Sequence, residues 1–268
     1  GNPKPPFFGG NRPGKNLYTN SVVALDIRSG HIVWFWQEVE HGLWDYDIPS
    51  PPILTTVERD KHQVDVVVAL TKIGNVIVLE RSSGKPLFDY RLRRAPTSNV
   101  PGEKTAPYQP DLELPEPVGT STFSLADVTD ISEKNRTSVI RQLDNVTYGF
   151  FQPPVLGKTL ISFGLHGGAE WPGGAIDHGK GMLFLTINNI PWKLRLSLVP
   201  TKNIESPESR GKALYKANCE SCHMPNRAGI VSVSGEKELE YVPSLVGASK
   251  IKIYSEKMQL SNWKERHL

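Results

Sequence analysis

The sequence predicts a mainly β protein, with about three to four blades of a β-propeller followed by the start of a small all-α unit. The first observation is a recurring hairpin: an apolar strand ending in an acid, a turn ending in Gly, and a strand with an aromatic residue. Its glycines, Gly30, Gly84 and Gly181, lie 54 and 97 residues apart, about one and two periods of propeller blades. The second observation is a change to helical composition after residue 200. A generic antiparallel β-domain with hairpins remains an open alternative.

The predicted strands are short runs of Val, Ile, Leu and aromatic residues. They span residues 21–26, 31–36, 64–70, 75–80, 86–88, 159–163, 175–177 and 182–185. Pro, Gly and polar residues predict loops at 1–20 and 99–120, and residues 132–143 predict a short helix. The expected domains are a partial propeller at 1–199, a polar linker at 200–209 and an α unit at 210–268. Within the last, helices are predicted at 210–218 and 255–263.

The overall composition is that of a globular protein with nearly balanced charge. The 268 residues carry a formal net charge of +3 without a dense Lys and Arg cluster, which argues against a nucleic-acid partner. No apolar run is long enough to cross a bilayer, and no secretory signal opens the chain.

The only two cysteines lie in the segment Cys219-Glu220-Ser221-Cys222-His223. Thiols at this spacing attach to the vinyl groups of a c-type haem, and the adjacent imidazole binds the iron. A thioredoxin-like pair needs a βαβ context that is missing here, and a zinc site needs a second ligand pair. A chance match in a structural loop is the remaining alternative. We therefore expect one haem c on Cys219, Cys222 and His223, with His223 as the iron ligand.

The residues around this motif resemble class I cytochrome c domains. Residues 211–219 resemble the first helix of that family, and residues 243–247 resemble the loop that packs on its haem. The resemblance implies a distal Met ligand, expected beyond Leu268. Met258 lies in a predicted helix and Met224 directly follows the proximal His, so packing or surface roles are favoured for both.

A second chemical signal is the segment Leu-Trp-Asp-Tyr-Asp, in which Asp45 and Asp47 alternate with large aromatic residues. A partly dry site raises the basicity of a carboxylate, and the oxidation of an alcohol needs a base for the hydroxyl proton. Lys72 follows 27 residues after Asp45, behind a strand that we expect to be buried. A cation there stabilises negative charge that develops on oxygen. The alternatives are loop acids that cap a turn and a solvated turn lysine.

Residues 1–198 resemble the quinoprotein dehydrogenases that use pyrroloquinoline quinone (PQQ), especially the glucose dehydrogenase-like branch. The resemblance rests on residues 16–26, 30–34, 41–47, 71–75, 100–105 and 167–171, which occur in family order. Ala24, Gly30 and Trp34 resemble the tryptophan-docking motif that links neighbouring blades. Because propellers of this family have about eight blades, the chain is expected to be an internal fragment that need not be active alone.

The resemblance also implies roles for individual residues. Asp45 is implied as the catalytic base and as a ligand to Ca²⁺, and Asp47 as a structural residue. Lys72 is implied to contact the carbonyls of PQQ. Asn2 matches an asparagine ligand to Ca²⁺, a hard ion that prefers amide and carboxylate oxygens.

The segment with Glu170 and Trp171 matches a Glu-Trp-Gly-Gly stretch near the cofactor, from which this sequence departs through Pro172. PQQ, Ca²⁺ and haem c are therefore the cofactors that the resemblance implies, with Glu170 and Trp171 among the PQQ contacts.

The implied function is a quinohaemoprotein dehydrogenase that oxidises a glucose-like aldose and passes electrons through the haem to an external acceptor, a quinone or a cytochrome. An alcohol or polyol is the second substrate class. A non-enzymatic electron-transfer protein on a propeller scaffold and a propeller interaction protein with a sensor haem are the alternatives of another kind. The expected location is the bacterial periplasm or cell surface, with membrane association left open.

Overall fold

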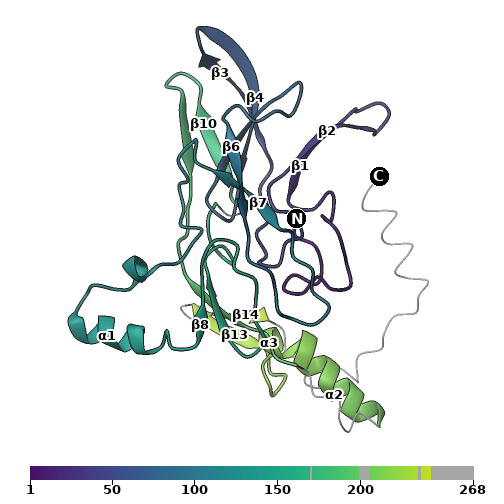
Figure 1. Ribbon diagram of the computed structural model, residues 1–268, viewed down its shortest axis with the longest axis vertical. Coiled ribbons are helices and arrows are strands. Elements are labelled where there is room, and N and C mark those ends of the chain that lie inside the picture. The colour runs from purple at the N-terminus through teal and green to yellow at the C-terminus, as the bar shows by residue number, and fades with distance from the viewer. Residues whose placement is uncertain (170, 199–205, 235–236, 243–268) are drawn as a thin grey trace. The chain divides into compact units, whose positions relative to one another are not determined.

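The computed structural model describes residues 1–169, 171–198, 206–234 and 237–242. By its internal contacts the chain divides into two units, Gly1–Ser197 and Leu198–Leu268. The first unit consists mainly of small antiparallel sheets (Figure 1). The predicted helix at 255–263, the loop at 243–247, Glu170 and Met258 lie outside the described residues.

The strands of the first unit pair mostly with their neighbours in sequence. They are β1 (Ser21–Leu25), β2 (Ile32–Gln37), β3 (Ile53–Arg59), β4 (His62–Leu70), β5 (Val76–Glu80), β6 (Tyr90–Arg94), β7 (Tyr108–Leu112), β8 (Val146–Thr147), β9 (Thr159–Ser162), β10 (Gly174–Asp177), β11 (Met182–Leu185) and β12 (Trp192–Arg195). The pairs β1–β2, β6–β7 and β10–β11 are two-stranded sheets, and β3–β4–β5 and β12–β9–β8 are three-stranded. Only the β8–β9 pair is parallel among the strands that the structure describes.

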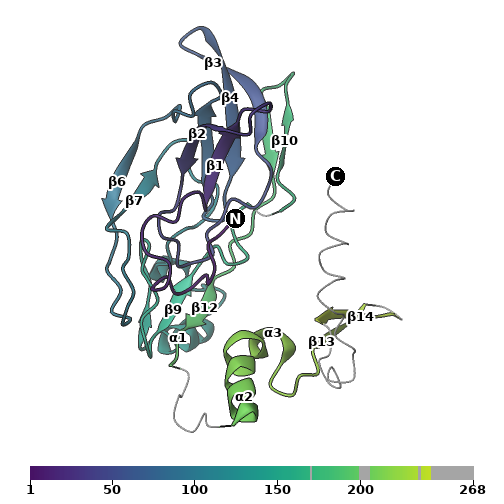
Figure 2. The ribbon, with the colours of Figure 1, turned by 90° about the vertical axis from the view of Figure 1, so that its right-hand side faces the viewer.

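The β3–β4–β5 sheet forms the centre of the first unit because both of its faces are covered. β4 ends in five consecutive buried apolar residues, and alternate side chains of a strand point to opposite faces. Val67 and Ala69 join a cluster with Trp36 of β2, whereas Val68 joins one with Leu183 of β11. Figures 1 and 2 show β1 and β2 on one side of β4 and β10 on the other. Sheets stacked in this way are blades, as the repeat predicted.

The two predicted hairpin turns at Gly30 and Gly84 have matching geometry. Gly30 N–H donates to Asp26 O at 2.7 Å, and Gly84 N–H donates to Glu80 O at 2.8 Å. Both glycines have φ of 70°, a conformation that disfavours residues with a Cβ. The repeated turn inferred from the sequence is therefore confirmed. The strand expected at 86–88 is not formed, because only Pro86 pairs there, in an isolated bridge with Leu79.

The docking role expected for Trp34 is also confirmed. Its Nε1–H donates to Arg81 O at 3.0 Å, across to the next hairpin turn. A Cβ added to Gly84 would lie 2.5 Å from the Trp34 ring, whereas one added to Gly30 would meet nothing within 4 Å. The absence of a side chain at Gly84 thus lets the indole of one blade rest on the next.

This difference makes Gly84→Ala and Gly30→Ala a matched pair. Both substitutions place a Cβ at φ of 70°, which costs about 1–2 kcal/mol. Gly84→Ala also overpacks against Trp34, so it is expected to lower the free energy of unfolding by about 1–3 kcal/mol more. Denaturant unfolding of the two variants measures the difference. Equal losses would contradict the docking contact.

The stretch at 99–120, expected to be a loop, contains β7 instead. Pro110 sits inside β7 opposite Leu92 of β6. Both strands of a two-stranded sheet are edge strands. Pro110 is therefore tolerated where its nitrogen, which carries no hydrogen, faces away from β6. The predicted helix at 132–143 is confirmed as α1 (Glu133–Arg141), whose N-cap Ser132 accepts a hydrogen bond from Asn135 N–H. A short 3₁₀ helix, η1 (Leu125–Asp127), precedes it.

The described part of the second unit combines two helices with a hairpin. The elements are α2 (Pro207–Asn218), α3 (Glu220–His223), β13 (Ile230–Ser234) and β14 (Lys237–Val242). The hairpin β13–β14 corrects the prediction of a purely helical unit. α2 begins inside the segment predicted as a linker, because Ser206 and Ser209 form a capping box around Pro207. No described helix is long and apolar enough to traverse a lipid bilayer.

Candidate active site

Lys72 joins two carboxylates that come from another loop. It lies in the turn between β4 and β5, and its Nζ is 3.0 Å from Asp45 Oδ2 and 2.9 Å from Asp47 Oδ1. The Lys72 and Asp47 side chains are 7% and 8% exposed, but that of Asp45 is 25% exposed. Asp45 is therefore the member of this cluster that a ligand in solution reaches most readily.

The charges of this cluster support one another. Burial acts to lower the pKa of the Lys72 ammonium, but the hydrogen bonds and charges of Asp47 and Asp45 outweigh burial and raise that pKa above its usual value. Lys72 is thus a fixed cation near neutral pH. The cluster sets one ammonium against two acidic side chains, an excess of acids that suits a neighbouring metal cation.

Two buried aromatic side chains anchor the loop that carries these acids. Trp44 Nε1–H donates to Gln152 O at 2.6 Å, and Tyr46 OH lies 2.7 Å from Ser162 Oγ. Burial raises the pKa of Tyr46 to about 12, against the opposing effect of the Ser162 hydrogen bond. The aromatic neighbours expected to make Asp45 a dry base thus act as anchors. The close partner of Asp45 is Lys72, which the sequence had placed near the cofactor and not beside the base.

A second segment packs on the Lys72 turn. Gly168 has φ of 62°, and a Cβ there would overlap the carbonyl oxygen of Lys72. Ala169 N–H donates to Thr71 O at 3.0 Å. Trp171 follows two residues later and is 69% exposed. A large, flat and exposed side chain therefore lies two residues after backbone that is packed against the Lys72 turn.

Asn2 reaches the same loop from the start of the chain. Its Oδ1 accepts from Asn20 Nδ2 at 3.3 Å, and a Cβ at Gly42 would lie 2.9 Å from that Oδ1. Gly42 precedes Asp45 by three residues. No group of three His, Cys, Asp or Glu side chains suited to a metal occurs among the described residues. Because Ca²⁺ takes about six to eight oxygens, Asn2 and Asp45 can supply only part of such a site.

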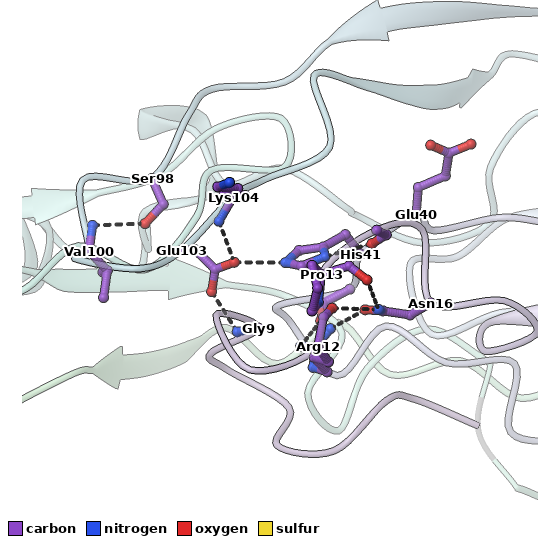
Figure 3. A network of polar contacts seen from close by, with 12 residues as sticks. Gly9, Arg12, Pro13, Asn16, Glu40, His41, Ser98, Val100, Glu103 and Lys104 are labelled. Atoms are coloured by element: carbon purple, nitrogen blue, oxygen red, sulfur yellow. Dashed lines mark hydrogen bonds and ion pairs between the residues drawn. The ribbon is translucent and has the colours of Figure 1, made fainter.

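A buried pair that the sequence reasoning missed holds the start of this loop (Figure 3). His41 Nε2 lies 2.7 Å from Glu103 Oε1, and His41 Nδ1 lies 2.8 Å from Gly14 O. Gly9 N–H donates to Glu103 Oε2 at 2.5 Å. The His41 and Glu103 side chains are 1% and 2% exposed. The pair thereby ties three distant segments together.

Both residues lie in segments that carried the family resemblance, but no role was assigned to them. A carbonyl only accepts, so the Gly14 contact requires a proton on His41 Nδ1. Arg12 adds a second tie, since its Nη2 donates to Gly42 O at 2.7 Å. Hydrogen bonds of His41 and of the Gly42 carbonyl therefore fix the backbone at 41–42, and with it the start of the loop that leads to Asp45.

The candidate haem motif lies in the second unit. Cys219 caps α2 as a half-buried free thiol, and His223 N–H donates to Cys219 O at 2.8 Å, one helical turn on. Tyr215 OH donates to Met224 O at 2.6 Å, which ties α2 to the residue after the motif. The side chain of Cys222 lies outside the described part. A thiol and an imidazole one turn apart fit covalent haem attachment.

The sequence matches, over residues 1–235, the family described as "PQQ: Glucose/ethanol/alcohol dehydrogenase, beta-propeller domain". The chain belongs to this family. The PQQ propeller expected from the sequence is therefore confirmed at the level of the family. The start of a cytochrome c domain is not confirmed by this match.

The curated relatives of this PQQ propeller chain differ in the substrates they are named for. Quinoprotein glucose dehydrogenase of Escherichia coli is 30% identical over 72% of this chain and 24% of its own length. The glycerol dehydrogenase large subunit of Gluconobacter oxydans is 31% identical over 67% of this chain and 25% of its own. The chain thus spans about a quarter of the length of these relatives.

Relatives named as haemoproteins also match this PQQ propeller chain. Quinohemoprotein alcohol dehydrogenase of Comamonas testosteroni is 38% identical over 27% of this chain and 10% of its own length. Its crystal structure matches with a TM-score of 0.43 and 22% identity, over 71% of this chain and 23% of that one.

Proposed function

We propose that the chain forms part of a PQQ-dependent dehydrogenase in which Asp45 is the catalytic base. The observation that carries this proposal is the Asp45–Lys72–Asp47 cluster inside a PQQ propeller. A scaffold protein has no need for a mostly buried ammonium between two carboxylates, one of which is open to solvent. When bound, PQQ supplies the two-electron acceptor for oxidation of a carbon that bears a hydroxyl group.

Each residue of the cluster has a distinct task in this proposal. Asp45, the more exposed acid, accepts the hydroxyl proton of the substrate. Asp47, buried beneath it, holds the Lys72 ammonium in place. Lys72 directs its N–H groups at an oxygen that gains negative charge, where a desolvated donor acts most strongly.

The cofactor contacts follow from the same geometry. Asn2 and Asp45 offer the amide and carboxylate oxygens that Ca²⁺ takes, and the excess of acids in the cluster suits a cation. The exposed indole of Trp171 offers a flat face to a planar ring. Glu170, outside the described residues, keeps its expected cofactor contact as part of this proposal.

We infer an aldose such as glucose as the substrate, with an alcohol or polyol as the second candidate. The named relatives support both classes, because they include glucose and glycerol dehydrogenases. We further propose that Cys219 and Cys222 hold a haem c with His223 on its iron, which passes electrons singly to an external quinone or cytochrome. Attachment of haem c favours the bacterial periplasm or cell surface.

An absorbance experiment tests both halves of this proposal. The dehydrogenase of which the chain forms part is loaded with PQQ and Ca²⁺, and its spectrum is recorded before and after glucose, glycerol and ethanol. Reduced c-type haem bands that grow with one substrate are the expected result, and Cys219→Ser combined with Cys222→Ser should remove the bands. If only dithionite reduces the haem, an electron-transfer protein is favoured. If no haem band exists, the assignment of the cysteines is wrong.

A further inference from the structure

Glu38 is a carboxyl group enclosed in the protein next to the turn that carries Lys72. It directly follows β2 and is 0% exposed. Three side chains are placed next to it. Asn75 and Thr71, at the two ends of the β4–β5 turn, hydrogen-bond to it, and Asn20, directly before β1, stands opposite it in the β1–β2 ladder. All three are uncharged. An ionised carboxylate enclosed in this way, without a cation, is costly.

Hydrogen bonds connect Glu38 to the backbone of that turn. Asn75 Nδ2 donates to Glu38 Oε1 at 2.8 Å, and Asn75 N–H donates to Thr71 Oγ1 at 3.1 Å. Gly74 N–H closes the turn by donating to Thr71 O at 2.9 Å. Lys72 lies inside this closed turn, so the position of its backbone depends on the side chain of Glu38.

Two buried oxygens beside this turn lack a hydrogen-bond donor. They are Glu38 Oε2 and Asn20 Oδ1. In the β1–β2 ladder Ser21 stands opposite Gln37, and one step on, Glu38 N–H donates to Asn20 O at 2.9 Å. Directly opposed residues lie on one face with Cβ atoms about 5 Å apart. The two oxygens therefore belong to neighbouring side chains.

The orientation of the Asn20 amide is set by its other contact. Asn20 Nδ2 donates to Asn2 Oδ1 at 3.3 Å, and Asn2 Nδ2 in turn donates to Pro3 O at 3.1 Å. A flipped Asn20 amide would place two acceptors against each other. Asn20 Oδ1 thus remains an acceptor, and the Glu38 side chain opposite it can supply a donor only when its carboxyl is protonated.

We propose that Glu38 is a neutral carboxylic acid that acts as a positioning residue for Lys72, donating its proton to Asn20 Oδ1 while its other oxygen accepts from Asn75. One proton on Oε2 gives both unpartnered oxygens a hydrogen bond and removes the buried charge. The chain of contacts then runs from Asn2 through Asn20 and Glu38 to the Lys72 turn. The effect on PQQ rests on the proposed function, whereas the protonation of Glu38 does not.

The electrostatics of the site agree with this geometry. Burial raises the pKa of Glu38 to about 8, although hydrogen bonds from Asn75 and Thr71 act to lower it. Because this pKa lies above that of the unfolded chain, the stability that Glu38 contributes is fully present below pH 4.5. It is lost as the pH rises to about 8.

Glu38→Gln and Glu38→Ala separate the neutral acid from a merely space-filling side chain. Glutamine imitates the protonated acid, since its Nε2 donates and its Oε1 accepts. Glu40→Gln is the matched control, because Glu40 lies two residues on, with a 26% exposed side chain paired to Lys15. At pH 7, infrared difference spectra are expected to show a carboxylic acid carbonyl band that Glu38→Gln removes and Glu40→Gln retains.

Thermal unfolding between pH 5 and pH 9 gives the second readout. The melting temperature of the wild type is expected to fall by several degrees relative to Glu38→Gln as the pH rises. Parallel curves, or a carbonyl band that survives Glu38→Gln, would overturn the neutral acid. Glu38→Ala should lower the melting temperature at every pH.

PQQ affinity, measured by quenching of tryptophan fluorescence, tests the positioning role. Glu38→Ala is expected to weaken binding by about tenfold, a loss of about 1.4 kcal/mol, and Glu38→Gln is expected to restore it. If Lys72→Met weakens binding but Glu38→Ala does not, the positioning role is overturned. If neither variant weakens binding while the carbonyl band behaves as expected, the proposed cofactor role of Lys72 fails and the neutral Glu38 stands.

Discussion

Asp45→Asn is expected to lower kcat by about 100- to 10,000-fold, because an amide cannot accept the substrate proton. The fold should hardly change, since Lys72 keeps its buried partner Asp47 and the Asp45 side chain is 25% exposed. Steady-state kinetics with glucose, on the dehydrogenase of which the chain forms part and with PQQ and Ca²⁺ loaded, measures the effect. Equilibrium binding of PQQ, measured in parallel, separates loss of chemistry from loss of cofactor.

Two variants bracket this result. Asp60→Asn changes an acid that is 91% exposed in the β3–β4 turn, and it should behave as the wild type. Asp45→Glu retains a carboxylate but moves it, so part of the activity should remain. An Asp45→Asn protein with more than about a tenth of wild-type kcat, against the expected loss, would move the base to another residue.

Lys72→Met is expected to lower the free energy of unfolding by about 3 kcal/mol and kcat by about 100-fold or more. The stability loss arises because Asp47, 8% exposed, keeps a buried charge without its ammonium partner. The loss of activity arises because no other described cation lies within ion-pair distance of Asp45 or Asp47. Denaturant unfolding and kinetics on the same preparation report both effects.

The double variant Lys72→Met with Asp47→Asn separates the two losses. Removing the uncompensated charge should return more than half of the lost stability, while the activity stays low. Lys85→Met, at an exposed position in the Gly84 turn, controls for the loss of any lysine. If the double variant regains activity, Lys72 serves only to neutralise Asp47.

Sequence reasoning succeeded where a local signal marked the structure. The hairpin turns at Gly30 and Gly84 place a Gly at a positive φ, and a Gly after an apolar strand is a signal that the sequence itself displays. The β3–β4 hairpin was missed because Asp60 and Lys61 adopt positive φ without a Gly. β7 was missed because Pro110 argues against a strand unless the partner leaves an edge free.

In the candidate site, too, single residues could be predicted from the sequence but their contacts could not. Asp45 and Lys72 were each singled out from sequence, but their ion pair depends on how β2, β4 and the following turns are juxtaposed. Glu38 gave no signal, since an acid after a strand usually faces solvent. Its burial results from the β4–β5 turn folding against β1–β2, a tertiary contact that no local pattern encodes.

The anchors of the Asp45 loop determine when the site can assemble. Trp44 bonds to Gln152 across 108 residues, and Tyr46 to Ser162 across 116, whereas the hairpins close over a few residues. Long-range contacts form late, because closing a long loop costs entropy before the contact returns it. A nascent chain stopped before residue 150 can therefore hold folded blades with an unfastened Asp45 loop. The contacts that fasten the Asp45 loop are thus complete only once β9 has been made, after the strands that flank Asp45.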